Sequence, residues 1–516
     1  MTRPAPPDAV QHACVLGGGS AGWMAAAALI NAMPGLRVTL VESEEIGTVG
    51  VGEATIPPIR VFNRRLGIDE ATFLRETNGT YKLGIAFSGW DRAGADYFHP
   101  FGQHGAEFDT VPFYHHWMAV WLRGEAAGID DYSMAWEAAR RGRFARPARD
   151  KRLIQSTFDY AYHFDAGLYA RFLRRYAEDR GVTRLEGVAE RVRRAGDGTV
   201  DAVALADGRT VEADFWIDCT GFRALLIGEA LGTPYEDWSG YLPADRAVAV
   251  PCAKAGAPLP YTRSTCRAAG WQWRIPLQHR TGNGYVYCSS YETKEDAERT
   301  LLANLDGAPL SQPRHLSFTT GRRARFWHRN VVAVGLSAGF MEPLESTSLH
   351  LIQYAVMRLL ALWPQRRDEP LLAREYDRLT TQEYERIRDF LILHYHANRR
   401  DEPFWRDRRD APIPDTLAYK IEHFRAGGVL VAEDRELFAN ASWLAVYLGQ
   451  NVLPERAPAI AGLREGVPVA ERLAQIRRAM TEAGAAMPEH MDYIERVGGL
   501  AAAPDPAPAP PLSAAI

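Results

Sequence analysis

The stretch HACVLGGGSAGWMAAAALINAMPGLRVTLVES, residues 12–43, decides the fold of this chain. It holds a short apolar strand, a glycine turn, an Ala-rich helix, a Pro-Gly break and a second strand that ends in Glu42. Gly17, Gly19 and Gly22 form the pattern G-x-G-x-x-G, whose glycines make a tight turn, let the backbone approach a pyrophosphate and allow close helix–strand contact. The N–H groups at the start of the helix face the phosphates, and Glu42 is placed to accept hydrogen bonds from ribose hydroxyls. The order of these features predicts a dinucleotide-binding α/β fold.

Composition sets the limits for the rest of the chain. The 516 residues are 47% hydrophobic, with 60 Lys and Arg against 64 Asp and Glu and a net charge of −4. Such a chain can bury a large core in two lobes or one elaborated domain. No basic run is long enough to follow a phosphate backbone, so nucleic acid is not an expected partner. The cysteines lack CxxC spacing, which favours reduced thiols in the cytoplasm over a disulfide framework or a metal site; they are Cys14, Cys219, Cys252, Cys266 and Cys288.

The N-terminal residues are not expected to export the protein. No apolar stretch precedes the first strand, so a signal peptide is not expected. The apolar run at 24–30 is too short to span a membrane and is expected in an amphipathic helix, so no membrane association is predicted. Residues 1–9 are Pro-rich and residues 501–516 are Ala/Pro low complexity, and we expect both to be flexible.

Two later segments favour FAD over NAD as the dinucleotide. ADFWIDCTGFRALL (213–226) is a strand that ends in a Thr-Gly turn, and VVAVGLSAGFMEPLESTS (331–348) is a strand followed by glycines. Flavoproteins of the aromatic-hydroxylase type use this trio of segments, with the late strand passing under the ribityl chain and the flavin ring. Leu336 stands where such hydroxylases usually have Asp, so that polar contact is made differently or is absent.

A pair of tryptophans marks a further segment, GWQWRIPL (270–277). Side chains alternate along an extended segment, so Trp271 and Trp273 point to the same face. This two-indole face is either a packed core strand or an aromatic wall beside a site.

Two charged residues lie in otherwise apolar surroundings. Lys82 belongs to NGTYKLGIAFSGW (78–90), and Glu345 belongs to MEPLESTS (341–348), just before an apolar helix. Taken singly, Lys82 fits a surface lysine with a packed stem, and Glu345 fits an acid in the first turn of a helix. A third stretch, VGVGEATIPPI (49–59), predicts an ordered loop beside the cofactor.

Together these motifs resemble one family. G-x-G-x-x-G, GVGEATIP, the lysine of YKLG, WQWRIP and EPLEST occur in the order typical of the flavin-dependent tryptophan halogenases, and the likeness runs from about residue 12 to about residue 450. The chain is identified as an indole-type member. The W-x-W-x-I-P signature is specific, because flavin hydroxylases lack it. The resemblance implies a tunnel wall that keeps the substrate away from the flavin, formed by Trp271, Trp273, Ile275 and Pro276.

The resemblance also implies a mechanism. Reduced FAD, made by a separate flavin reductase, and oxygen convert a bound chloride or bromide into hypohalous acid, which travels down a tunnel to the substrate. Lys82 matches the essential lysine, whose ammonium hydrogen-bonds this acid or whose nitrogen forms a haloamine. Glu345 matches the glutamate that orients the electrophile and accepts the ring proton or stabilises the ring cation.

The other site residues follow from the same match. The halide site falls on Thr347 and Ser348 at the start of the helix that begins near residue 349, where many relatives have glycine in place of Ser348. The residues that the resemblance places against FAD are Gly17, Gly19, Ser20, Ala21, Gly22, Glu42, Glu53, Ala54, Val188, Leu336 and Leu349.

The substrate site matches the family only in part. His99, Phe101 and Trp443 match the rings that stack an indole in tryptophan halogenases. In tryptophan-specific enzymes the segment before that tryptophan supplies tyrosines and a glutamate to hold the amino-acid group. Here the segment at 427–442 has Val431 and Phe438 near those positions, so we expect indole or an indole derivative to be preferred over tryptophan.

The expected architecture is an α/β fold with a GR2-like Rossmann FAD lobe over residues 10–365, in which substrate and tunnel segments, including a substrate-binding sheet, are interleaved. A mainly helical C-terminal lobe is expected over 366–500, and a homodimer is left open. Two other functions remain at this point. A single-component FAD-dependent aromatic hydroxylase would consume NAD(P)H itself and hydroxylate its substrate, and a flavin-binding protein without catalysis would make Lys82 and Glu345 incidental.

Overall fold

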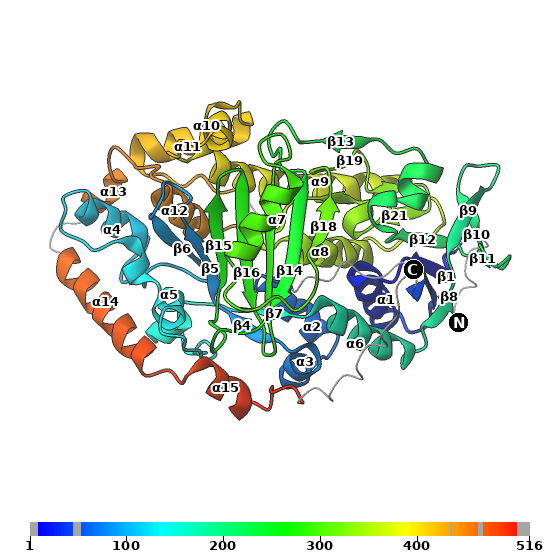
Figure 1. The fold of residues 1–516 in the computed structure, drawn as a ribbon, viewed down its shortest axis with the longest axis horizontal. Helices are drawn as coiled ribbons and strands as arrows, with labels where there is room; N and C mark the ends of the chain where they lie inside the picture. Colours follow the sequence, from blue (N-terminus) through cyan, green and yellow to red (C-terminus); the bar gives the residue numbers. More distant parts are fainter. Residues whose placement is uncertain (1–8, 45–52, 434–435, 463–467, 503–516) are drawn as a thin grey trace.

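A parallel sheet at one end of the molecule carries the glycine-rich turn. The computed structural model describes residues 9–44, 53–433, 436–462 and 468–502 (Figure 1), so most of the two expected flexible tails lies outside the described residues. The sheet has the order β20-β21-β12-β1-β2-β8, and all its neighbours are parallel except β20 and β21. Its strands are β1 (His12–Leu16), β2 (Arg37–Glu42), β8 (Thr183–Glu186), β12 (Phe215–Asp218), β20 (Trp327–His328) and β21 (Val331–Ala333). The strands β1, β12 and β21, which belong to the three segments that favoured FAD, are therefore neighbours, and the predicted strand that ends in Glu42, β2, lies next to β1.

Helix α1 (Ser20–Ala32) is buried rather than amphipathic. Every residue from 22 to 30 is buried, because α6 (Ala166–Glu178) and α8 (Ser348–Ala361) also pack on this helix. A helix that is apolar all round belongs in the interior, so the prediction of an amphipathic helix is wrong. A Cβ atom at Gly22 would lie 1.8 Å from the carbonyl oxygen of Gly17, and Gly17 itself has a φ of +110°. Both positions therefore require glycine.

A second, larger sheet lies in the middle of the molecule (Figure 1). Its seven strands have the order β18-β14-β17-β16-β15-β5-β6 and are antiparallel except for the pair β5 and β15. They are β5 (Gly84–Ser88), β6 (Asp96–Pro100), β14 (Arg246–Cys252), β15 (Thr262–Arg267), β16 (Gly270–Pro276), β17 (Thr281–Tyr287) and β18 (Arg314–Ser317). This sheet presents the predicted tryptophan pair on β16 and the predicted substrate residue His99 on β6.

A small sheet, β3-β7-β4, carries the predicted cofactor residues Glu53 and Ala54 on one edge strand and the predicted catalytic residue Lys82 on the other. Its strands are β3 (Glu53–Ala54), β4 (Thr80–Lys82) and β7 (Ala161–Phe164), with β7 in the centre. Ala54 pairs with His163, and Lys82 pairs with Ala161. The stretch 49–59 was predicted as a loop; residues 49–52 lie outside the described ranges, and Glu53 and Ala54 form a strand.

The C-terminal part of the chain is helical, as predicted. After residue 365 the described residues form helices and no strands, and α10 to α14 lie towards the end of the molecule opposite the parallel sheet (Figure 1). The helices are α9 (Pro370–His396), α10 (Pro403–Asp410), α11 (Asp415–Gly427), α12 (Asn440–Gly449), α13 (Ala459–Gly462), α14 (Val469–Ala485) and α15 (His490–Arg496). The division into lobes at residue 365 stays a prediction.

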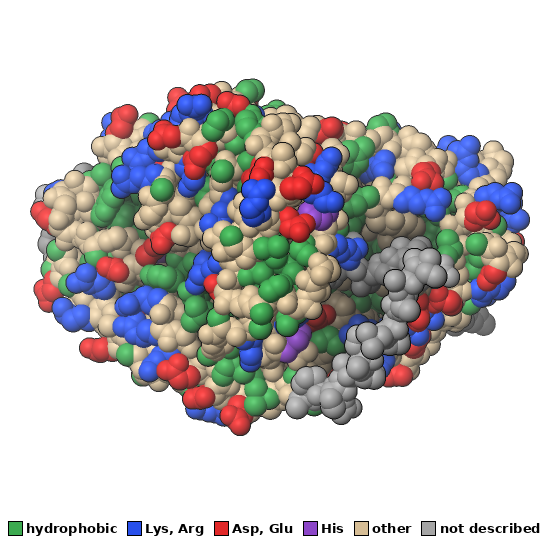
Figure 2. Space-filling view, viewed as in Figure 1, with side chains coloured by type: hydrophobic (Ala, Val, Ile, Leu, Met, Phe, Trp, Pro, Cys, Tyr) green, Lys and Arg blue, Asp and Glu red, His purple; other side chains and the backbone are tan. Residues whose placement is uncertain are grey.

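The remaining elements are short. The helices are α2 (Pro58–Arg65), α3 (Glu70–Thr77), α4 (Phe113–Trp121), α5 (Met134–Ala139) and α7 (Lys294–Ala303). One three-stranded sheet is formed by β9 (Ala189–Arg194), β10 (Val200–Leu205) and β11 (Thr210–Glu212). Another is formed by β13 (Tyr235–Asp237), β19 (Gly321–Arg323) and β22 (Gly339–Phe340). Acidic and basic side chains are interspersed on the face shown in Figure 2. Among the helices that could be described, none has the length and apolarity needed to cross a bilayer.

Candidate active site

Lys82 ends strand β4 with its side chain fully buried. Its Nζ donates a hydrogen bond of 2.8 Å to Oγ of Ser346 and lies 5.1 Å from the ring centroid of Phe101. Burial lowers the pKa of Lys82 to about 7, although the charge of Glu345 acts in the opposite direction. The interpretation of Lys82 as a surface lysine is therefore wrong. The structure provides an amine that is neutral about half of the time at neutral pH.

Glu345 is buried between two histidines. It lies on the single turn of 3-10 helix η7 (Pro343–Glu345), which precedes α8, so it is not an acid of the α8 first turn. Nδ1 of His99 is 2.8 Å from one carboxylate oxygen, and Nε2 of His394 is 2.9 Å from the other. Burial alone would raise the pKa of Glu345, but the two histidines more than offset it and hold the pKa at about 2. Glu345 is therefore ionised at neutral pH.

A turn in the left-handed conformation joins these two groups. Ser346 has a φ of 60°, which is uncommon for a residue other than glycine, and its hydroxyl accepts the hydrogen bond from Lys82. Because Ser346 directly follows Glu345, the chain brings the lysine and the carboxylate into one buried cluster. The sequence motif contained Ser346 but gave no reason to assign it a role.

The start of α8 is where the halide site is predicted. Thr347 is the residue before the first helical turn, which begins at Ser348, one residue earlier than expected, and its side chain does not cap the helix. The Thr347 hydroxyl is buried and has no hydrogen-bond partner among the described residues. Free N–H groups and the positive end of the helix dipole favour an anion at such a terminus.

The start of α1 fits a pyrophosphate. Gly19 precedes the helix, no side chain caps it, and a Cβ atom placed there would meet nothing within 4 Å. Ser20 and Ala21 form the first turn. Leu336 lies on the 3-10 helix η6 (Gly335–Ser337), which approaches the start of α1 at Gly335, where a Cβ would be 2.8 Å from the Ala21 side chain. The residues present therefore fit a dinucleotide here.

Two other predicted cofactor residues already have protein partners. Glu42 accepts hydrogen bonds from Arg184 Nε at 2.6 Å and from the Trp23 indole at 3.2 Å. A carboxylate can accept further bonds, so a ribose contact remains compatible with these partners. The carbonyl of Val188, between β8 and β9, accepts the N–H of Ala206. Arg184 was missed from the sequence, since nothing local ties it to Glu42.

The tryptophan pair lies on β16 as expected. The ring centroids of Trp271 and Trp273 are 6.0 Å apart, both side chains are buried, and neither indole N–H has a partner among the described residues. Farther along the same strand, the carbonyl of Pro276 accepts a hydrogen bond from the Thr80 hydroxyl at 2.7 Å. This contact joins the tryptophan strand to β4, the strand that carries Lys82.

The predicted substrate residues are only partly brought together. His99 and Phe101 lie beside Glu345 and Lys82. Trp443, on α12, contacts Phe390 with centroids 5.0 Å apart, and Phe390 also lies 5.8 Å from His99. Phe438 stacks on Phe390 at 3.9 Å. Phe390 therefore contacts a ring from each face of the expected clamp, and Phe438 packs on Phe390.

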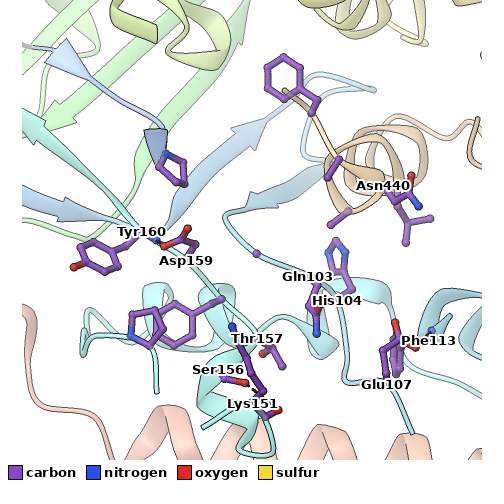
Figure 3. Close-up of a pocket in the computed structure, with 18 of the residues that line it drawn as sticks. Gln103, His104, Glu107, Phe113, Lys151, Ser156, Thr157, Asp159, Tyr160 and Asn440 are labelled. Atoms are coloured by element: carbon purple, nitrogen blue, oxygen red, sulfur yellow. Dashed lines mark hydrogen bonds between the residues drawn. The ribbon is translucent and has the colours of Figure 1, made fainter. Parts of the chain in front are cut away.

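A cavity of about 1240 Å³ lies next to this cluster. Figure 3 shows polar side chains around it, among them Gln103, His104, Thr157, Asp159 and Asn440. His104 is buried, neither of its ring nitrogens has a partner among the described residues, and burial with the nearby His99 lowers its pKa to about 3. Phe438 also lines the cavity, and its ring centroid lies 6.1 Å from that of His99.

The molecule combines a dinucleotide-binding fold with a buried lysine and carboxylate that lie just before α8, a helix other than the one that follows the glycine-rich turn. This combination indicates an enzyme that uses a nucleotide cofactor. The family model of the tryptophan halogenases matches residues 12–465. The chain is 34% identical to tryptophan 6-halogenase SttH of Streptomyces toxytricini, over 94% of this chain and 98% of that protein. Among solved structures, Xcc4156, a flavin-dependent halogenase from Xanthomonas campestris, is 46% identical with a TM-score of 0.93, covering 96% of this chain and 100% of that one. BrvH, a flavin-dependent halogenase from Brevundimonas sp. BAL3, is 43% identical with a TM-score of 0.91, covering 95% and 99%.

The chain belongs to the tryptophan halogenase family and is a flavin-dependent halogenase. The resemblance found in the sequence is thereby confirmed, and a single-component hydroxylase is not favoured.

Proposed function

We propose that this halogenase uses FAD reduced by a separate flavin reductase to attach chlorine or bromine to indole or a related electron-rich heteroaromatic. The observation that carries the proposal is the buried cluster of Lys82, Ser346 and Glu345 beside the start of α8. A merely structural lysine is seldom buried next to an unsatisfied helix terminus and an ionised carboxylate.

The FAD site is proposed at the first turn of the parallel sheet. Gly17, Gly19, Ser20, Ala21 and Gly22 would hold the pyrophosphate, and Glu42 and Val188 would contact the adenosine. Leu336, Leu349, Glu53 and Ala54 would line the flavin. When bound, reduced FAD together with oxygen supplies the oxidising power that turns a halide into hypohalous acid. The halide would bind at Thr347 and Ser348.

Lys82 would transfer the halogen as a neutral amine. Its nitrogen attacks the halogen of hypohalous acid, the oxygen–halogen bond breaks, and the departing hydroxide takes a proton from nitrogen to leave as water. A ring carbon of the substrate then attacks the halogen, the nitrogen–halogen bond breaks, and the proton lost by the ring restores the amine. A Lys82 pKa of about 7 makes this amine available near neutral pH.

Glu345 would stabilise the positive charge that develops on the ring. With a pKa of about 2 it is a weak base, so electrostatic stabilisation suits it better than proton abstraction. His99, Phe101 and Trp443 would surround the substrate ring. Trp271, Trp273, Ile275 and Pro276 would form the wall between flavin and substrate.

Indole is proposed over tryptophan because Phe438, in the segment at 427–442, presents an aromatic ring beside His99. Phe438 lies 6.1 Å from His99 and stacks on Phe390, where an amino-acid group would need polar partners. Stripping water from an ammonium and a carboxylate without replacing their hydrogen bonds is unfavourable.

The described cysteines are all free, which supports a reducing compartment such as the cytoplasm.

The test supplies FAD, NADH, a flavin reductase, bromide and indole. We expect a product heavier by bromine, formed only when the reductase is present. A product heavier by oxygen, or NADH consumption without the reductase, would instead indicate a hydroxylase. If the protein binds FAD and no product forms, the result would favour a flavin-binding protein without catalysis.

A further inference from the structure

His104 presents a buried ring to the cavity of about 1240 Å³. The residue is only 6% exposed, and among the described residues that line the cavity it is the one whose buried polar atoms have no hydrogen-bond partner. Figure 3 draws its ring between Gln103 and Asn440, which line the same cavity. A buried polar group without a partner is unfavourable unless a ligand or water supplies one. The ring is therefore placed to hydrogen-bond a molecule in the cavity.

The backbone around His104 is fixed by hydrogen bonds on both sides. The N–H of Gln103 donates to the carbonyl of Thr157 at 2.9 Å, and the N–H of Gly105 donates to the carbonyl of Tyr132 at 2.7 Å. A group whose position is set before a ligand arrives loses little entropy on binding. His104 therefore has the rigidity that recognition of one substrate over another requires.

The same loop connects His104 to the cluster around Lys82. Phe101 lies three residues before His104, and its N–H donates to the carbonyl of Leu83, the residue after Lys82, at 2.8 Å. Three residues of chain span at most about 11 Å. The charge of His99 helps to lower the pKa of His104, so these two rings are also close. A substituent on an aromatic ring held at His99 and Phe101 is therefore within reach of His104.

The protonation state of His104 favours an uncharged partner. Burial and the charge of His99 lower its pKa to about 3, so the ring is neutral at neutral pH. One nitrogen of a neutral imidazole donates a hydrogen bond and the other accepts one. A carboxamide can bind either nitrogen, whereas an ionised carboxylate can bind only the donor and an ammonium only the acceptor.

The carboxylates of the cavity wall already have protein partners. One of the five described ones, Glu107, accepts the backbone N–H of Phe113 at 3.0 Å. An ammonium group in the cavity would have to compete with these partners for its counter-charge. The other four carboxylates pair with a cation each: Glu70 with Arg146, Asp159 with Arg60, Glu433 with Arg386 and Glu436 with Lys420.

Three cations of the cavity wall, Arg64, Arg149 and Lys151, are exposed to water. Exposed charges are hydrated and screened, so they attract a carboxylate only weakly. They would not compensate a carboxylate for the water that it loses beside His104.

We propose that His104 is a specificity-determining residue, which hydrogen-bonds an uncharged donor and acceptor group, such as a carboxamide, on the side chain of the indole substrate. The inference rests on the proposed function, because it takes the aromatic ring to lie at His99 and Phe101. It extends that function from the bare ring to a class of substituted indoles.

The affinities of four indoles test the proposal without turnover. The probes are 3-methylindole, indole-3-acetamide, indole-3-acetate and tryptamine, which are titrated calorimetrically into the enzyme with oxidised FAD bound and no reductase present. We expect indole-3-acetamide to bind about fivefold to tenfold more tightly than 3-methylindole, as one added hydrogen bond provides. It should also bind more tightly than either charged probe.

Two substitutions at His104 locate the preference. His104→Phe keeps an aromatic ring and removes both nitrogens, so it should bind 3-methylindole at least as tightly as wild type and lose the preference for the amide. His104→Gln, which has a donor and an acceptor of its own, should keep part of the preference. His115→Phe is the matched control, because His115 lies on α4 and is not among the residues that line the cavity; it should behave as wild type.

Equal affinities of the wild type for the amide and for 3-methylindole would overturn the proposal, and this comparison needs no variant. A preference that survives in His104→Phe would also overturn it. Tighter binding of indole-3-acetate or of tryptamine would overturn it by assigning recognition to the exposed cations or to the carboxylates. Binding of none of the four probes would refute the proposed substrate ring, and the inference with it. Failure to brominate indole while the amide preference holds would refute the proposed reaction alone and support His104 as a binding residue.

Discussion

The pH dependence of halogen transfer should report the state of Lys82. If the neutral amine reacts, the rate follows the deprotonated fraction and rises with pH through the pKa of about 7. That fraction is about one-eleventh at pH 6, one-half at pH 7 and ten-elevenths at pH 8, so the rate should rise about tenfold over this range. A lysine with its ordinary pKa would be deprotonated in only about one molecule in 3000 at pH 7, and its rate would rise about tenfold per pH unit without levelling off.

The assay must measure the pH dependence of the halogenase separately from that of the reaction that reduces FAD. FAD is reduced beforehand without oxygen, the halogenase, bromide and indole are added, and the mixture is combined with oxygenated buffer at each pH. Brominated product is quantified by mass spectrometry. Lys82→Arg is the matched control for charge, because a guanidinium stays protonated throughout, and Lys82→Met removes the nitrogen at similar length.

We expect both variants to give no brominated indole at any pH. A wild-type rate that falls as pH rises from 6 to 8, together with substantial activity in Lys82→Arg, would refute the reasoning. That pair of results would mean that an ammonium only hydrogen-bonds the hypohalous acid.

Four further outcomes are expected. Lys82→Ala should abolish bromination while FAD binding, followed by flavin absorbance, is unchanged, since the lysine lies apart from the glycine-rich turn; turnover above a few per cent of wild type would contradict its role. Glu345→Gln should slow bromination by about 100-fold without abolishing it, because the amide keeps its place and loses the negative charge; rates equal to wild type would exclude a catalytic role. Indole should be brominated faster than tryptophan and at C3, as located by NMR; faster turnover of tryptophan with one benzo-ring product would show that amino-acid anchors exist. Gly22→Ala should yield protein that does not retain FAD, because its Cβ would lie 1.8 Å from the carbonyl oxygen of Gly17. The control Gly35→Ala should retain FAD, because a Cβ there would meet nothing within 4 Å. Equal FAD content in the two variants would contradict the packing argument.

The strands predicted from local pattern agree with the structure. β1, β2, β12 and β21 are short apolar runs with their motifs attached, so each could be recognised by itself. Taken singly, Lys82 fitted a surface lysine and Glu345 an acid in the first turn of a helix, and both interpretations were wrong, because both side chains are buried and Glu345 lies on the turn before α8. The prediction of an amphipathic helix at 20–32 was also wrong, because that character depended on whether α8, more than 300 residues later, also covers the helix.

Contacts between distant segments could not be predicted. His394 reaches Glu345 only because α9 ends against the turn before α8, and nothing in its own segment indicates a carboxylate partner. Arg184 meets Glu42 through the pairing of β8 with β2. Phe390 contacts both His99 and Trp443, and a clamp inferred from two matching motifs did not reveal this shared neighbour.

The left-handed backbone at Ser346 sets the activity of this enzyme against its stability. A side chain in that conformation carries strain on the order of 1–3 kcal/mol, which glycine would relieve. Ser346→Gly should therefore raise the melting temperature. It should also remove the hydroxyl that accepts the hydrogen bond from Lys82 in the described part of the chain. Selection for heat resistance alone would favour that glycine, and proteins stabilised in this way would lose halogenation although they fold better. Position 346 should accordingly be held as serine in any library built to make this enzyme more durable.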